Sequence, residues 1–130
     1  MYYLPYTQFV SLYGEALEIK DPDMYIAERG WQDWMDPFDV DTIVKTLDTV
    51  RDISLRSFQE LRKETGLSQA RMACAYGLKT RTIENWESGS RIPPEHDKIL
   101  LSYTIFLEIM NKGENIKGME DGNGCIAEQD

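Results

Sequence analysis

Residues 61–93 read LRKETGLSQARMACAYGLKTRTIENWESGSRIP, and this stretch decides the fold that we expect for the chain. It falls into three short segments, and each ends at a glycine, the residue that most readily takes the left-handed conformation at a helix end. Ser57 and Glu60 have the spacing of a capping box before the first segment, and Ser68 is placed to cap the second. We therefore expect three consecutive short helices. Their expected ends are Gly66, Gly77 and Gly89.

The second and third segments, joined across AYGLKT, have the features of a helix-turn-helix. The first helix of such a pair needs a small residue where the second crosses it, and Ala73 fits. The turn needs a residue that takes positive φ, and Gly77 fits, while Ile83 and Trp86 have the spacing of an inward face. The outer side must carry short polar or basic side chains that reach base edges and phosphates. Those residues are Lys79, Thr80, Arg81, Thr82 and Asn85.

A longer series of residues keeps one register through this region. The series is Leu61-Arg62, Gly66-Leu67-Ser68-Gln69, Met72-Ala73, Gly77, Thr80, Thr82, Ile83, Trp86-Glu87, Gly89 and Pro93. In this register residues 55–110 resemble the phage repressor/Cro-type helix-turn-helix family, also called the xenobiotic-response-element type. The family usually has a leucine where this chain has Met72. So many matches at fixed spacing make the resemblance specific.

The resemblance implies which side chains would read DNA. Thr80, Arg81 and Thr82 fall where base-reading side chains sit in the family, and Arg81 is placed for a bidentate contact to guanine. Asn85, one turn further on, would meet a base or a phosphate. The simpler alternatives are that Arg81 is a solvated surface arginine and that the helical unit no longer binds DNA.

The resemblance also implies contacts to the DNA backbone. Gln69 matches a residue that bonds a phosphate and braces the next helix. Lys79, Ser90 and Arg91 would add further phosphate contacts. Glu84 would face near the DNA and repel phosphate unless it accepts a hydrogen bond from cytosine.

Two further residues match a structural pair of the family. Arg62 and Glu87 fall where a partly buried ion pair ties the first helix to the third. Most members follow the proline with two short helices, whereas here the sequence predicts one longer helix over residues 95–110.

The formal net charge of -9 is unevenly distributed. Residues 1–50 hold ten Asp or Glu against three Lys or Arg, residues 51–94 hold five against eight, and residues 95–130 hold eight against three. The helix-turn-helix segment is therefore mildly basic and lies between two acidic arms. Such arms would weaken non-specific DNA binding, and they are also candidate surfaces for a partner.

The N-terminal arm is predicted to be helical. Apolar residues recur at helical spacing up to Leu17, with Thr7 as the expected N-cap, and Asp21 is placed to cap a second helix at DPDMYI. Trp31 and Trp34 are expected to be buried against these helices, with an exposed docking patch as the alternative.

A third N-terminal helix is expected from Asp39 onward. Its apolar residues fall on one stripe, which favours a helix over a strand. The stripe consists of Val40, Ile43, Val44, Leu47 and Val50.

The predicted architecture is therefore all-α. Residues 1–52 form an acidic helical N-terminal extension, residues 53–111 a repressor-like helix-turn-helix bundle, and residues 112–130 a disordered Gly-rich tail.

No motif in the sequence predicts a catalytic, metal or cofactor site. The acidic run DPFDVD lacks the spaced ligands of a calcium loop, so we expect it to cap a helix. Cys74 and Cys125 are too few for a disulfide framework or a metal site, and Cys74 falls in an apolar pattern typical of a small core residue. The chain lacks both an apolar run of about 18 residues and a basic leader, so we expect a cytoplasmic protein that does not span a membrane.

These observations predict a sequence-specific transcriptional regulator. We expect a homodimeric repressor that reads a palindromic operator in double-stranded DNA with the helix 79–88, its dimer face coming from the N-terminal helices or from the helix 95–110. The alternative is a protein-binding inhibitor or antitoxin, for example a mobile-element anti-CRISPR-type protein. Its acidic N-terminal region would bind a protein partner while the helix-turn-helix autoregulates its gene. An enzyme would need a titratable cluster in a pocket, and the sequence places none.

Overall fold

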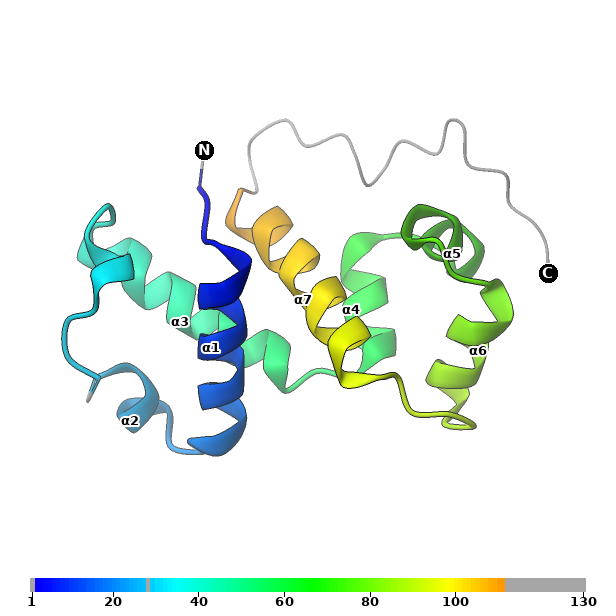
Figure 1. The fold of residues 1–130 in the computed structure, drawn as a ribbon, viewed down its shortest axis with the longest axis horizontal. Coiled ribbons are helices and arrows are strands. Elements are labelled where there is room, and N and C mark those ends of the chain that lie inside the picture. Colours follow the sequence, from blue (N-terminus) through cyan, green and yellow to red (C-terminus); the bar gives the residue numbers. More distant parts are fainter. Residues whose placement is uncertain (1, 28, 112–130) are drawn as a thin grey trace.

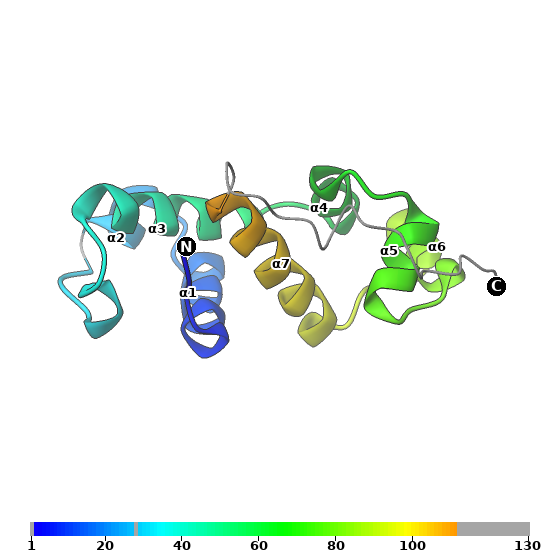
Figure 2. The ribbon, with the colours of Figure 1, turned by 90° about the horizontal axis from the view of Figure 1, so that it is seen from above.

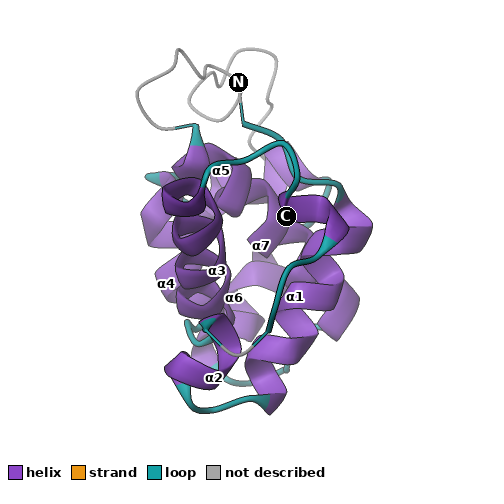
Figure 3. Cartoon of the chain, turned by 90° about the vertical axis from the view of Figure 1, so that its left-hand side faces the viewer, coloured by secondary structure: helices purple, strands orange, loops and turns teal. Residues whose placement is uncertain are grey.

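The computed structural model describes residues 2–27 and 29–111, and all regular structure in this part of the chain is helical (Figure 3). The elements are α1 (Tyr6–Glu18), α2 (Pro22–Ile26), the 3-10 turn η1 (Asp33–Met35), α3 (Val40–Ser54), α4 (Phe58–Thr65), α5 (Gln69–Tyr76), α6 (Thr80–Ser88) and α7 (Glu95–Met110). The all-α prediction is confirmed. None of these helices is long and apolar enough to cross a bilayer. The tail expected to be disordered, with Cys125, lies outside the described residues.

Helix α7 joins two groups of helices. It packs against α1 and α3 on one side and against α4 on the other, so that α1–α3 and α4–α6 flank it (Figure 1). Seen from above, α7 runs diagonally between the two groups (Figure 2). One cluster of buried apolar side chains extends through both groups, and Phe106 in α7 is completely buried within it. The expected boundary at residues 52/53 falls in the last turn of α3.

The N-terminal segment is tied to the end of α7, more than 100 positions away in the sequence. The backbone N–H of Tyr2 donates to Asn111 Oδ1 at 2.8 Å, and Asn111 Nδ2 donates to the Tyr2 carbonyl at 3.1 Å. The hydroxyl of Tyr103 donates to the carbonyl of Leu4 at 2.6 Å. Tyr2 also stacks on Phe38, with ring centroids 5.1 Å apart. Tyr2 and Leu4 are therefore part of the packed structure.

The apolar stripe of α3 is buried only in part. Ile43, Leu47 and Val50 are buried as expected, but Val40 is 66% exposed and Val44 is also exposed. The apolar stripe is wider than the surface that α1, α2 and α7 cover, so its Val40–Val44 edge faces solvent. Thr46 is completely buried, with hydrogen bonds to the Thr42 carbonyl and the Tyr2 hydroxyl satisfying its side chain.

The prediction for the tryptophan pair is wrong for one member. Trp31 is 63% exposed and donates its indole N–H to Asp36 at 2.8 Å, whereas Trp34 is half-buried and donates to Gln32 at 2.7 Å. The fully buried residue of this segment is Met35, whose unbranched side chain fills the gap instead.

In the N-terminal group, which consists of α1, α2 and α3, two of the predicted helix caps are confirmed and one is wrong. Asp21 accepts from the Asp23 N–H, and Asp39 of the DPFDVD run accepts from the Thr42 N–H, so both carboxylates cap helices as expected. The prediction for Thr7 is wrong, because α1 starts one residue before it, with Pro5 at the N-cap and no side-chain cap bond.

Candidate nucleic-acid interface

Capping residues and terminal glycines set where α4, α5 and α6 begin and end around the candidate site. Ser57 and Glu60 form the expected capping box of α4, and the Ser68 side chain accepts from the Arg71 N–H at the start of α5. Glycines in the left-handed conformation end all three helices. Their φ angles are 77° at Gly66, 71° at Gly77 and 88° at Gly89. Gly77 reverses the chain between α5 and α6, which pack on each other.

Buried contacts fix the inner side of α6. Ile83 is completely buried, and Ala73 in α5 is buried where the two helices pack. Trp86 is half-buried and meets the ring of Phe58 edge-on, with centroids 5.1 Å apart. These contacts leave the opposite side of α6 facing solvent.

A nearly buried ion pair ties α6 to α4. Nε and Nη2 of Arg62 both donate to the carboxylate of Glu87, and Gln69 Nε2 donates to the same carboxylate at 2.9 Å. The side chains of Arg62 and Glu87 are 14% and 4% exposed. Burial raises the pKa of Glu87, but the hydrogen bonds from Arg62 and Gln69 and the charge of Arg62 outweigh it and hold the pKa below its ordinary value.

The exposed side of α6 borders an open groove of about 380 Å³. Five of the eight side chains predicted to contact DNA line it: Lys79, Arg81, Thr82, Asn85 and Arg91. Trp86, Ile92 and Pro94 complete the lining. The groove therefore combines three cations with two short hydrogen-bonding side chains.

The positive charge of this groove is not neutralised within the described part of the chain. None of the ion pairs found there involves Lys79, Arg81 or Arg91. Glu84 is exposed on the same helix and is the carboxylate that would oppose an anion. The three cations of the groove outnumber this one exposed carboxylate, so the local charge favours an anionic ligand.

Three predicted contact residues lie outside this groove. Thr80 is half-buried in the first turn of α6, and Gln69 holds Glu87 with its side-chain amide. Ser90 follows Gly89, and its hydroxyl is 3.0 Å from that of Ser88. Ile92 was missed by the sequence reasoning, although it is 88% exposed. The Pro93-Pro94 pair that follows it was the available signal, because consecutive prolines hold a chain away from helical packing.

The remaining polar groups of the described residues add no second chemical site. No group of three His, Cys, Asp or Glu side chains among them is placed to hold a metal ion. Cys74, expected to be a small core residue, is only half-buried on α5. The chain matches no protein-family model, no curated protein and no solved structure.

Proposed function

We propose that the chain is a sequence-specific DNA-binding protein of the helix-turn-helix class, with α5 and α6 as the two helices of the motif. The observation that carries the proposal is the groove beside α6, which gathers Lys79, Arg81, Thr82, Asn85 and Arg91. An exposed helix of this kind fits the major groove of DNA, where short polar and basic side chains reach base edges. The resemblance to Cro-type repressors, drawn from the residues of 55–110, supports the same proposal.

The ion pair between Arg62 and Glu87 supports this function through rigidity. A recognition helix must hold its side chains in a fixed orientation to distinguish one base pair from another. The bidentate contact from α4 and the third hydrogen bond from Gln69 restrain α6 from both neighbouring helices. Gln69 therefore acts first as a brace for α6, and its amide oxygen, which has no hydrogen bond within the described residues, remains available for other contacts while the second amide hydrogen can meet a phosphate.

We propose that the regulator acts as a homodimeric repressor in the cytoplasm. A single unit covers one half-site, and two units related by a two-fold axis would cover half-sites about one helical turn, roughly 34 Å, apart. The buried part of α7 packs within its own chain, whereas Val40 and Val44 on α3 are exposed. The N-terminal group thus offers apolar surface for the dimer contact.

A selection from a random DNA library tests the function directly. Full-length protein at near-physiological salt is expected to recover a palindromic site, and sedimentation should show two protein chains on one duplex. The affinity for that site should exceed the affinity for unrelated DNA by about 10³-fold or more. Folded protein that recovers no sequence above background contradicts the proposal.

A second candidate function is binding of a protein partner by the N-terminal group, as an inhibitor or antitoxin. Trp31 favours it, because an indole that is 63% exposed is unusual on a surface without a partner. Residues 1–50 also hold ten carboxylates against three cations, which suits a basic partner.

This second function is best tested by substituting a surface residue rather than by deleting the N-terminal region. Deleting residues 1–50 would remove buried residues such as Phe9 and Leu12 from the shared core, so loss of binding would be uninformative. Trp31→Ala leaves the core intact. It should abolish co-purification of a partner from the source cell and leave operator binding unchanged, with Trp34→Phe as the matched aromatic control. Equal recovery of the partner with Trp31→Ala would contradict the assignment.

A further inference from the structure

A second cavity, separate from the groove beside α6, also has Trp86 in its lining. Its volume is about 270 Å³, and its walls come from α4, the end of α5, the turn that follows, α6 and α7. Most of the wall is apolar, and Leu100, which is 42% exposed, stands where the cavity meets solvent. The cavity is of the size that a small organic molecule occupies.

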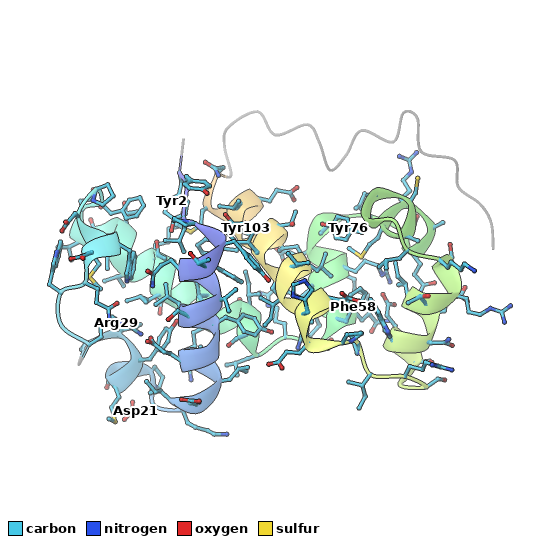
Figure 4. The ribbon with its side chains drawn as sticks, viewed as in Figure 1. Tyr2, Asp21, Arg29, Phe58, Tyr76 and Tyr103 are labelled. Atoms are coloured by element: carbon cyan, nitrogen blue, oxygen red, sulfur yellow. The ribbon has the colours of Figure 1, made fainter. Side chains whose placement is uncertain are left out.

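Three aromatic rings line this cavity. The rings of Phe58 and Trp86 meet at 74°, so they form two adjoining walls rather than one flat surface. Tyr76 supplies the third ring, and Figure 4 shows Phe58 and Tyr76 between α7 and the α5–α6 pair. Burial raises the pKa of Tyr76 to about 12, partly offset by its hydrogen bond with Thr104, so its ring stays neutral at physiological pH.

One carboxylate, that of Asp97, also lines the cavity. Asp97 lies in the first turn of α7 and is half-buried. Within the described residues neither an ion pair nor a side-chain hydrogen bond holds this carboxylate. A cation that enters the cavity would therefore be the first counter-charge placed beside this carboxylate.

We propose that this cavity binds a small organic cation, an alkylated or quaternary ammonium compound. Aromatic faces attract such ions through the negative face of each ring, and Asp97 provides the opposite charge at the same place. A neutral or anionic ligand would leave the carboxylate unpaired or repel it. A hard metal ion would need six or more oxygen ligands, and this cavity offers few.

Occupancy of the cavity is expected to change DNA affinity. Trp86 lines both the cavity and the groove with Arg81 and Asn85, so a ligand that fixes its ring also biases α6. Linkage requires that DNA change the affinity for the cation by the same factor. This regulatory part depends on the proposed DNA-binding function, whereas binding of the cation does not.

Choline and its neutral isostere 3,3-dimethyl-1-butanol provide a matched pair of probes. Titration into the full-length protein, followed by ¹H–¹⁵N spectra, should give saturable shifts of the Trp86 indole signal with choline at a dissociation constant of about 1 mM. The neutral alcohol should bind at least about tenfold more weakly, because it has the same shape without the charge. Trp31→Phe and Trp34→Phe identify the indole signals.

Two substitutions test the site without removing an aromatic wall. Asp97→Asn should weaken choline binding about tenfold, and Leu100→Trp should block the mouth of the cavity. Asp33→Asn, an exposed carboxylate change in the N-terminal group, is the charge-matched control and should leave binding unchanged. Equal binding of the alcohol, or equal loss with Asp33→Asn and Asp97→Asn, would overturn the proposal.

The regulatory part is measured on the selected operator. Saturating choline should change the affinity of the wild-type protein for this DNA, and the change should vanish in Leu100→Trp. Choline binding without any change in DNA affinity would overturn the proposed coupling, while the proposed cation site would still stand. A protein that binds choline but selects no DNA would contradict the proposed function alone.

Discussion

The two groups of helices on either side of α7 share one core but present different surfaces. Around α6 the surface carries short polar side chains and three cations that form no ion pair within residues 2–27 and 29–111, and Ile92 is an exposed apolar residue there. The α1–α3 group is strongly acidic and carries most of the large exposed apolar side chains. These are Tyr3, Leu17, Met24, Trp31, Val40 and Val44. The comparison teaches that helices sharing one core can present two surfaces that differ in charge and in exposed apolar area.

The strongest test of the shared core is Phe106→Ala. Phe106 is completely buried in α7 and packs on the rings of Phe9 and Tyr2 at centroid distances of 5.1 and 5.7 Å. Removing this ring should lower the free energy of unfolding by about 3–5 kcal/mol. Chemical denaturation followed by circular dichroism measures this loss, with Leu100→Ala on the exposed side of α7 as the milder control.

The same denaturation tests whether the two groups unfold together. The Trp34 indole signal reports the N-terminal group, and the Trp86 signal reports α6. Because one core extends through both groups, the two signals should disappear at the same denaturant concentration. A native Trp86 signal that persists after the Trp34 signal is lost would show that the groups are separate folding units.

The second prediction concerns the ion pair that holds α6. Glu87→Gln leaves the buried guanidinium of Arg62 without its counter-charge and should cost about 2–3 kcal/mol of unfolding free energy. Glu84→Gln, an exposed glutamate on the same helix, should cost almost nothing. An equal cost for the two variants would mean that the pair contributes no net stability.

The pH dependence of stability gives an independent check on this pair. The pKa of Glu87 is lowered in the folded chain, so its contribution is present above the ordinary carboxyl pKa and is lost as the pH falls through the lowered value. Wild-type stability should therefore fall more steeply than that of Glu87→Gln in acid. Parallel curves for the two proteins would contradict the assignment.

The sequence predicts the α4–α6 group better than the α1–α3 group, and the reason is the range of the signals. Ser57 with Glu60, Ser68 and Gly77 act within four positions of the element that they start or end, so their effect is readable without the fold. The exposure of Trp31 and the burial of Thr46 depend on which distant residues lie opposite them. Thr46 is buried because Tyr2, 44 positions away, bonds its hydroxyl.

The residues of the candidate site also divide into those that the sequence predicts and those that depend on how the helices pack. Arg81, Thr82 and Asn85 follow from helical spacing on α6, and the structure places them together in one groove. The resemblance implies that Gln69 braces the next helix and bonds a phosphate; its hydrogen bond to Glu87 on α6 agrees with the bracing role, which the resemblance did not assign to a particular partner. The cavity containing Asp97 was not predictable, because its walls come from four helices whose packing the sequence pattern does not specify.

Two cations of the same groove, Arg81 and Lys79, are expected to contribute differently to DNA binding. Arg81→Ala should lower the affinity for the selected operator by about 1–3 kcal/mol and relax the preference at one base position. Lys79→Ala should weaken binding to all sequences alike and reduce the salt dependence by about one unit. Anisotropy titrations on operator and scrambled duplexes measure both effects, with Lys45→Ala on α3 as the charge control. Equal loss on both duplexes for Arg81→Ala would make it a phosphate contact.

The smallest expected effect compares the helix starts of the two groups. Ser57→Ala removes the side chain that accepts from the Glu60 N–H and should cost about 1 kcal/mol. Thr7→Ala should cost only a few tenths of that, because Thr7 is exposed inside α1 and caps nothing. Thermal melting of the two variants measures the difference. A larger loss for Thr7→Ala would mean that Thr7 caps α1, as the sequence pattern predicts, and that Pro5 and Tyr6 lie outside the helix. The same pattern of a hydroxyl residue before an apolar run therefore has different consequences in the two groups, depending on whether the backbone turns into the helix at that residue.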